Sequence, residues 1–309
     1  MSVAERVSAG QAGLKSFWTL QVSFGTNCVW WGSWKGQSGV ADDPLQFFFS
    51  REILGEIACR LSGEYERGSP FPHVVIDEIV PDSVLDCVLN EVPQAGTDEF
   101  ASRMDPTEHK FSLADVEQMG PVTRHLLSEF NGAPFLEFVS TLTGIDGLVP
   151  DPYFFGGGIH LIERGGYLKV HADFSLHPRL HIDRRLNAII YLNKNWGLTY
   201  GGNLELWDES MERCVRSIEP VFGRLVLFRT TGASYHGHPD PLNTPAGVSR
   251  RSLALYYYTG QSADLERRYS TAFQRRPGES VRRTAHQVAY RWLPPVVVEA
   301  VKKRRKTAR

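Results

Sequence analysis

The chain has 309 residues, of which 42% are hydrophobic and 22% charged, and its formal net charge is −1. This composition is typical of a globular protein with a substantial core, and it excludes disordered and collagen-like chains. No apolar run approaches the roughly 18 residues of a membrane span, and the four cysteines are scattered without a C-x-x-C pair. These features predict a cytoplasmic protein.

The N-terminal part of the chain is the least regular. Residues 1–48 show no sustained hydrophobic period, so we regard them as an extension without an assigned role. Helical spacing begins in "FFFSREILGEIACRLSG", where Ser50 could cap the helix and Ile53, Ile57 and Leu61 would share its buried face.

Alternating elements follow up to about residue 150. "PFPHVVIDEIV" predicts a strand, and "PDSVLDCVLNEV" predicts a helix capped by Asp82 or Ser83. "PVTRHLLSEFN" and "APFLEFVSTLTG" predict two more helices, and Gly144 would end the second of them.

Short strand-like runs separated by Gly, Pro and Asn fill residues 150 to 260. They are "GIHLIERGGYLKVHADF", "RLNAIIYLN", "GGNLELWD", "RCVRSIEP", "GRLVLFRT" and "RRSLALYYYT". Their length and spacing predict an antiparallel sandwich or barrel. A helical first half would then support a β-rich second half.

Three His-x-Asp triplets are candidates for a metal chelate: 171–173, 181–183 and 238–240. The second is followed by Arg184 and Arg185, which we expect to pair with Asp183, and the third lies in a Pro-rich turn. The first ends a strand-like run, so His171 and Asp173 would share one face of an extended chain. We therefore select the first triplet.

A third ligand is expected from another strand. The run "GRLVLFRTTGASYHGHPDP" supplies His236, with His238 as the alternative. Two imidazoles and one carboxylate form the facial ligand set of non-haem Fe(II) oxygenases, which leaves coordination positions open. His177 and His181 lie in a loop next to the selected triplet, and we interpret them either as substrate-loop residues or as exposed loop histidines.

Two further strands carry candidates for binding an anion. Arg250 and Ser252 are two residues apart on a predicted strand, and a guanidinium fork with a hydroxyl suits a carboxylate. Asn187, Ile189 and Tyr191 likewise share a face of another predicted strand.

Seven segments follow one another in the order "PFPHVVIDEIVP", "GGYLKVHADF", "RRLNAIIYLNKNW", "GGNLELWD", "GRLVLF", "SYHGHP" and "RRSLALYYYT". With these segments, residues 70 to 260 resemble the Fe(II)/2-oxoglutarate-dependent dioxygenases, and within them the prolyl 4-hydroxylase-like branch. The resemblance implies a mainly β fold, a double-stranded β-helix (jelly-roll) barrel supported by N-terminal helices. It also implies Fe(II), 2-oxoglutarate and O₂ as cofactors, with ascorbate as a candidate reductant.

The resemblance assigns roles residue by residue. His171, Asp173 and His236 would bind the metal, and Arg250 would bind the distal carboxylate of 2-oxoglutarate. The further residues that would contact the cosubstrate are Tyr191, Ser252, Asn187 and Ile189. Arg251 is adjacent to Arg250, and the register of the following aromatic residues favours Arg250. Related halogenases replace the carboxylate ligand with a small residue, so Asp173 favours hydroxylation.

The predicted function is hydroxylation of an unactivated C–H bond in a small-molecule or peptidyl substrate, prolyl or otherwise amino-acid-derived, with release of succinate and CO₂. Residues 49–262 would form the dioxygenase domain, with helical support in 49–148 and the jelly roll in 149–262. Residues 263–309 would be a basic, partly helical tail, which leaves nucleic acid open as a partner. The alternatives are a cupin-like metal enzyme without 2-oxoglutarate and an inactive jelly-roll binding module.

Overall fold

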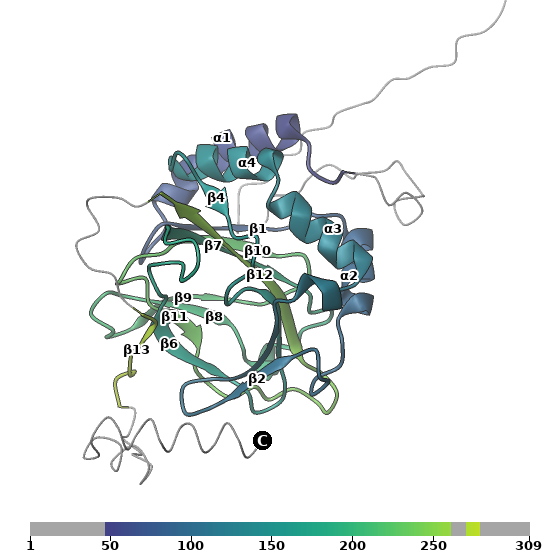
Figure 1. Cartoon of the computed structure of the whole chain (residues 1–309). Coiled ribbons are helices and arrows are strands. Elements are labelled where there is room, and N and C mark those ends of the chain that lie inside the picture. The colour runs from purple at the N-terminus through teal and green to yellow at the C-terminus, as the bar shows by residue number, and fades with distance from the viewer. Residues whose placement is uncertain (1–46, 261–269, 279–309) are drawn as a thin grey trace, which may run out of the picture.

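The computed structural model describes residues 47–260 and 270–278 (Figure 1). The predicted extension therefore lies outside the described residues except at its end, and so does most of the predicted basic tail. The helices are α1 (Arg51–Glu66), α2 (Asp82–Glu91), α3 (Pro121–Phe130) and α4 (Ala133–Thr143), with 3-10 turns η1 (Val116–Gln118) and η2 (Leu198–Tyr200). No described helix has the length and apolar character needed to cross a membrane.

The helices lie where the hydrophobic spacing predicts them, with differences at their ends. In α1 the side chains of Ile57 and Leu61 are buried as expected, but Ile53 is 39% exposed. Ser50 precedes α1 without a side-chain capping bond. Gly144 ends α4 in the left-handed conformation, with φ of 65°, which glycine adopts without strain.

One helix is capped from a distance, which the sequence pattern does not reveal. The Glu91 carboxylate, at the end of α2, accepts hydrogen bonds from the backbone N–H groups of Val122 (3.0 Å) and Thr123 (2.7 Å). A negative charge at this end of α3 is favoured by the helix dipole. The contact fixes α2 and α3 together on the outside of the barrel.

The strands form two antiparallel sheets. Their bounds are β1 (His73–Ile76), β2 (Ala101–Met104), β3 (His109–Leu113), β4 (Val149–Pro150), β5 (Gly158–Ile162), β6 (Leu168–Ala172), β7 (Asp183–Tyr191), β8 (Leu204–Trp207), β9 (Cys214–Ile218), β10 (Leu225–Arg229), β11 (His236–His238), β12 (Arg250–Thr259) and β13 (Ala272–Phe273). The larger sheet runs β1-β10-β7-β12-β5-β3-β2, with β4 pairing β12, and the smaller runs β13-β6-β11-β8-β9.

From β5 to β12 the chain passes back and forth between the two sheets, with β8 and β9 paired as neighbours in the smaller one, which is the winding of a double-stranded β-helix (Figure 1). The helices cover the outer face of the larger sheet, and the smaller sheet faces it across the interior (Figure 1). The predicted jelly-roll barrel with supporting helices is confirmed. In this fold, a ligand site is expected in the interior between the two sheets.

The main core lies between the helices and the larger sheet. Phe130, Phe135 and Phe138 are fully buried, and the rings of Phe130 and Phe135 meet edge to face with centroids 4.7 Å apart. The Tyr257 hydroxyl of β12 donates a 3.0 Å hydrogen bond to the carbonyl of Phe130. Each of these buried aromatic side chains contributes roughly 1.5–3 kcal/mol through burial, so the layer is a rigid support for the barrel.

Two elements at the edges of the sheets differ from the prediction. The hairpin of β2 and β3 extends the larger sheet beyond β5, in a segment for which no strand is predicted. Strand β13 lies within the predicted tail 263–309, yet it pairs with β6 and places Ala272 opposite Ala172. Residues 272 and 273 of the predicted tail therefore belong to the smaller sheet, because the outer edge of β6 is otherwise free to pair.

Candidate metal centre and active-site cavity

Neighbouring strands of the smaller sheet bring two histidines face to face. His171 on β6 and His236 on β11 are direct partners in the register, and their ring centroids lie 4.5 Å apart. The Nδ1–H of His171 donates to the carbonyl of Lys169, and that of His236 to the carbonyl of Ser234, each at 2.9 Å. A carbonyl oxygen only accepts, so both rings keep the Nε2 lone pair for a metal.

Asp173, just beyond β6, completes the group. One carboxylate oxygen lies 3.5 Å from Nε2 of His171, and the other lies 3.4 Å from Nε2 of His236. One donor atom from each of the three residues lies within 4.8 Å of the other two. A two-histidine, one-carboxylate set at this separation could hold Fe(II) on one face of an octahedron and leave the opposite face open. The predicted three residues are thus brought together.

The protonation states of these residues suit metal binding. Burial alone would raise the pKa of Asp173, but the Arg184 guanidinium and the two histidines hold it well below its usual range. Burial lowers the pKa of His236 to about 4. The carboxylate is therefore ionised and the imidazole of His236 neutral near pH 7, as ligands must be.

A buried arginine and amide hold the Asp173 carboxylate. Nη2 of Arg184 lies 3.0 Å from Oδ2 of Asp173, and Nδ2 of Asn187 donates to the same oxygen at 2.7 Å. Arg184 also donates to Oδ1 of Asn187 through Nε (3.0 Å) and Nη2 (2.6 Å). Its guanidinium lies 3.5 Å from the centre of the Tyr256 ring and 4.6 Å from that of Phe174.

This arrangement corrects one prediction and adds contacts to another. Arg184 was expected to pair with Asp183, its neighbour in the sequence, but successive side chains on β7 point to opposite faces, and Arg184 reaches Asp173 across the barrel. Asn187 was expected among the cosubstrate residues. It lines the cavity as predicted, and its amide also bonds Asp173 and Arg184.

Arg250 lies in the interior as predicted, at the start of β12. Its Nε donates to the carbonyl of Gly202 at 2.7 Å, and its Nη2 to the hydroxyl of Tyr191 at 3.3 Å. It is 5% exposed, and in the described part of the chain no carboxylate forms an ion pair with it. The Nε of the adjacent Arg251 instead bonds Ser249, and this residue does not line the cavity. The geometry therefore favours Arg250 as the anion-binding residue.

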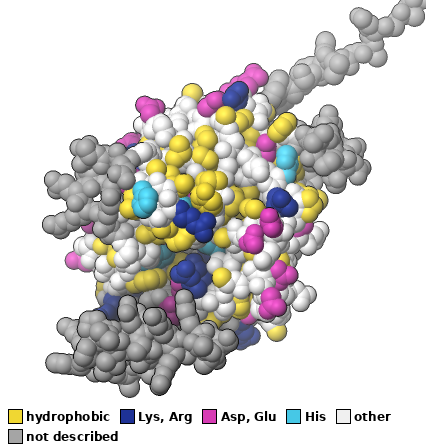
Figure 2. All heavy atoms as spheres, in the orientation of Figure 1, with side chains coloured by type: hydrophobic (Ala, Val, Ile, Leu, Met, Phe, Trp, Pro, Cys, Tyr) yellow, Lys and Arg dark blue, Asp and Glu magenta, His cyan; other side chains and the backbone are white. Residues whose placement is uncertain are grey.

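A cavity of about 290 Å³ joins the metal-ligating group to Arg250. Figure 2 shows Lys and Arg side chains gathered around a hollow in this face, with His side chains inside it. The predicted residues on its wall are His171, Asp173, Asn187, Ile189, His236, His238, Arg250 and Ser252. Tyr191 does not line it directly and reaches it through its bond to Arg250.

His238, the alternative ligand, lies outside the group of three. Its imidazole is 4% exposed, and neither ring nitrogen has a hydrogen-bond partner among the described residues. Burial lowers its pKa well below the usual value, and the Arg250 charge adds to this effect. His238 is therefore a neutral wall residue beside Arg250.

Of the two loop histidines, His177 differs from both interpretations, whereas His181 fits that of an exposed loop histidine. His177 is completely buried; its Nε2 lies 3.1 Å from the Asp151 carboxylate, and its Nδ1 accepts from the backbone N–H groups of Arg179 and Leu180. It holds the loop together and is not a substrate residue. His181 is exposed, with φ of 55°.

The family model of the 2OG-Fe(II) oxygenase superfamily matches residues 157–258, the segment that carries His171, Asp173, His236 and Arg250. Residues 157–258 belong to this superfamily. The resemblance seen in the sequence is confirmed, and the chain is an oxidoreductase of the dioxygenase type. Fe(II), 2-oxoglutarate and O₂ are its metal, cosubstrate and oxidant.

Several solved structures are similar to the chain. They include a Trichoplax adhaerens prolyl hydroxylase in complex with a hypoxia-inducible-factor peptide (18% identity, 67% of this chain and 91% of that one, TM-score 0.48). A Phytophthora capsici prolyl 4-hydroxylase is 19% identical over 79% of this chain and 73% of that one, with a TM-score of 0.48. Streptomyces hygroscopicus HygX with nickel, 2-oxoglutarate and hygromycin B bound is 13% identical over 65% of this chain and 92% of that one, with a TM-score of 0.42. No curated protein matches the chain significantly.

Sequence reasoning missed several residues that line this oxygenase cavity, among them Arg184, Lys110 and Phe273. Phe273 of β13 packs on His171 with ring centroids 5.3 Å apart. A strand of two residues leaves no period to detect, so its position was not predictable. Regular alternation along "DRRLNAIIY" would place Arg184 on the face of Leu186 and Ala188, away from the cavity. A bulge next to Arg184 changes that face, and the sequence pattern does not mark the bulge.

Proposed function

We propose that the chain hydroxylates an unactivated C–H bond of an amino-acid-derived substrate, with release of succinate and CO₂. The observation that carries the proposal is one cavity with two ends. At one end His171, Asp173 and His236 converge, and at the other Arg250 offers a guanidinium without a carboxylate partner in the described structure. A dicarboxylate cosubstrate could bridge these ends.

His171, Asp173 and His236 would hold Fe(II), and the fixed tautomers of both histidines keep the coordinating Nε2 atoms directed at the same point. When bound, iron and 2-oxoglutarate supply the oxidising chemistry. The protein contributes orientation, because Asn187 and Arg184 hold one carboxylate oxygen of Asp173 and limit how far it can turn.

Arg250 would bind the distal carboxylate of 2-oxoglutarate, and Tyr191 would support it. The bonds from Arg250 to Gly202 and Tyr191 fix the plane of the guanidinium while leaving Nη1 for a ligand. Ser252 and Ile189 line the same wall and would contact the chain of the cosubstrate. Burial makes the ion pair strong, since a buried guanidinium is costly without an anion.

Anaerobic titration of the metal-free chain with Fe(II) and then 2-oxoglutarate tests this function. The resemblance implies a visible charge-transfer band that Asp173→Ala abolishes and Arg250→Ala weakens; succinate release then reports turnover with candidate substrates. Iron binding without the band would favour the cupin-like alternative. Binding of neither would mean an inactive barrel.

A further inference from the structure

The cavity carries more positive than negative charge. Of the described residues that line it, Arg103, Lys110, Arg184 and Arg250 are cationic, and Glu108 and Asp173 are carboxylates, a balance of +2. Fe(II) and the dianion of 2-oxoglutarate cancel each other, so the loaded cavity keeps this balance. The Arg103 side chain is 62% exposed, so solvent screens its share of this excess, whereas Lys110 is 14% and Arg250 5% exposed. Positive charge in the interior favours an anionic ligand.

The excess is not all at the cosubstrate end. Arg184 is neutralised by Asp173, and Arg250 has the position for 2-oxoglutarate. The remaining excess belongs to the β2–β3 hairpin, where Arg103 and Lys110 share one carboxylate, that of Glu108. This hairpin lies on the far side of β5 from Arg250.

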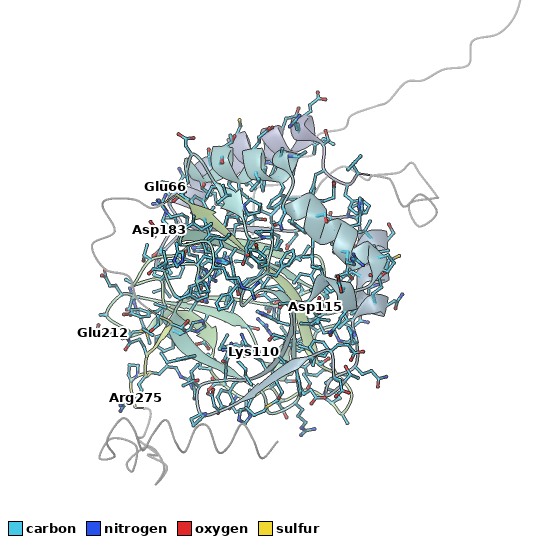
Figure 3. All side chains as sticks on the ribbon, in the orientation of Figure 1. Glu66, Lys110, Asp115, Asp183, Glu212 and Arg275 are labelled. Carbon is cyan, nitrogen blue, oxygen red and sulfur yellow. The ribbon has the colours of Figure 1, made fainter. Side chains whose placement is uncertain are left out.

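The sheet register places Lys110 on the same interior row as Arg250. Arg103 is paired with Lys110, the register of Phe111 with Leu161 sets Lys110 beside Ile162, and Ile162 is the partner of Arg250. Lys110 is thus two strands from Arg250, about 10 Å at the usual strand spacing. Figure 3 labels Lys110 between β2 and the centre of the barrel.

The Lys110 ammonium is incompletely satisfied. Its side chain is 14% exposed, and Nζ lies 3.3 Å from Oε2 of Glu108, whose other oxygen lies 3.1 Å from Nη1 of Arg103. Burial lowers the pKa of Lys110, and Glu108 offsets only part of this effect. An ammonium has three donors, and one long contact leaves capacity for another acceptor.

We propose that Lys110 is the anchor for a carboxylate of the substrate, and that the substrate is a small amino-acid-type carboxylic acid rather than an internal residue of a polypeptide. This inference rests on the proposed function. The volume agrees with it, because about 290 Å³, at the low end for small-molecule sites, must hold both 2-oxoglutarate and the substrate.

The test compares carboxylic acids with their primary amides on the full chain loaded anaerobically with Fe(II) and 2-oxoglutarate. The probes are the common L-amino acids, their N-acetyl derivatives and the amide of each. Binding is read from the change in the visible band and, after admission of O₂, from succinate release. The variants are Lys110→Met, which keeps the stem, Lys110→Arg, which keeps the charge, and Lys194→Met, a control for a half-exposed lysine paired with Asp86 outside the cavity.

For at least one acid, we expect binding about 10–100-fold tighter than for its amide, the usual worth of a hydrogen bond to a charged group. Lys110→Met should remove this preference, Lys110→Arg should retain part of it, and Lys194→Met should match the unaltered chain. The 2-oxoglutarate dissociation constant should change less than about twofold in all of them. The acid-to-amide comparison on the unaltered chain stands even if Lys110→Met folds poorly.

Equal binding of acids and amides, or no binding of any acid, would overturn the inference. So would a 2-oxoglutarate affinity lost in Lys110→Met, since Lys110 would then hold the cosubstrate. Absence of the band in the unaltered chain is a different result, because it would refute the proposed function itself.

Discussion

Arg184 allows a sharp test of how the carboxylate ligand is held. The Arg184 side chain is 1% exposed, and its guanidinium lies 3.0 Å from the Asp173 carboxylate and over the rings of Tyr256 and Phe174. Arg184→Met keeps much of the stem but removes the charge. Breaking a buried ion pair from one side costs about 3–5 kcal/mol, because the other charge is left without compensation. We expect the metal-free variant to lose that amount of unfolding free energy.

A divalent metal should reverse most of this loss. In the metal-free variant the Asp173 carboxylate keeps the hydrogen bond from Asn187 but loses its cationic partner, and a bound metal cation replaces the missing guanidinium. Mn(II) should therefore stabilise Arg184→Met more than the unaltered chain by about 2–3 kcal/mol, which corresponds to roughly 30–150-fold tighter binding. Urea denaturation with EDTA and with Mn(II) measures both quantities.

Two controls make the result decisive. Arg185→Met alters the neighbouring arginine, which bonds Thr259, and should cost less than about 1 kcal/mol. The double variant Asp173→Asn, Arg184→Met should recover much of the loss, since both charges are gone. The reasoning is refuted if Arg184→Met costs less than about 1 kcal/mol or if its Mn(II) affinity falls.

Further outcomes follow from other residues of the cavity. Arg250→Lys should weaken 2-oxoglutarate binding by at least about tenfold, because an ammonium cannot reproduce the guanidinium fork, while Arg251→Lys should leave it unchanged; anaerobic titration compares them. The unfolded chain protonates at His238 below about pH 6.5, whereas the folded chain, with its lowered pKa, does not. Stability of the metal-free chain should therefore fall as the pH drops from 6.5, by up to about 1.4 kcal/mol per unit for this group, and His238→Leu should show a shallower decline in urea titrations. Phe273→Ala should speed metal loss to a chelator, since the ring packs on His171, and an unchanged rate would contradict that role.

The parts of the fold and site that could be predicted depend on local pattern. His171 and Asp173 share a face because strands alternate with period two, and that rule needs only three residues of sequence. The partner of Arg184 depends instead on which strands meet across the barrel, so the prediction that it pairs with its sequence neighbour Asp183 is wrong. His177 is a similar case: a histidine in a polar loop reads as exposed, and its burial comes from Asp151, 26 positions earlier. Lys110 lies on a hairpin that its own sequence does not mark, so its place two strands from Arg250 in the same sheet emerges only from the register.

The late return of the chain to β6 has a consequence for synthesis. The outer edge of the strand that carries His171 is covered by Ala272 and Phe273, about one hundred residues downstream. At roughly 5–20 residues per second, a ribosome takes about 5–20 s to add them. In the last part of that time, after His236 has been added, all three metal ligands are present while the outer edge of β6 is still uncovered. A metal ion that binds before Ala272 and Phe273 are in place would enter a site that still lacks β13 on one side.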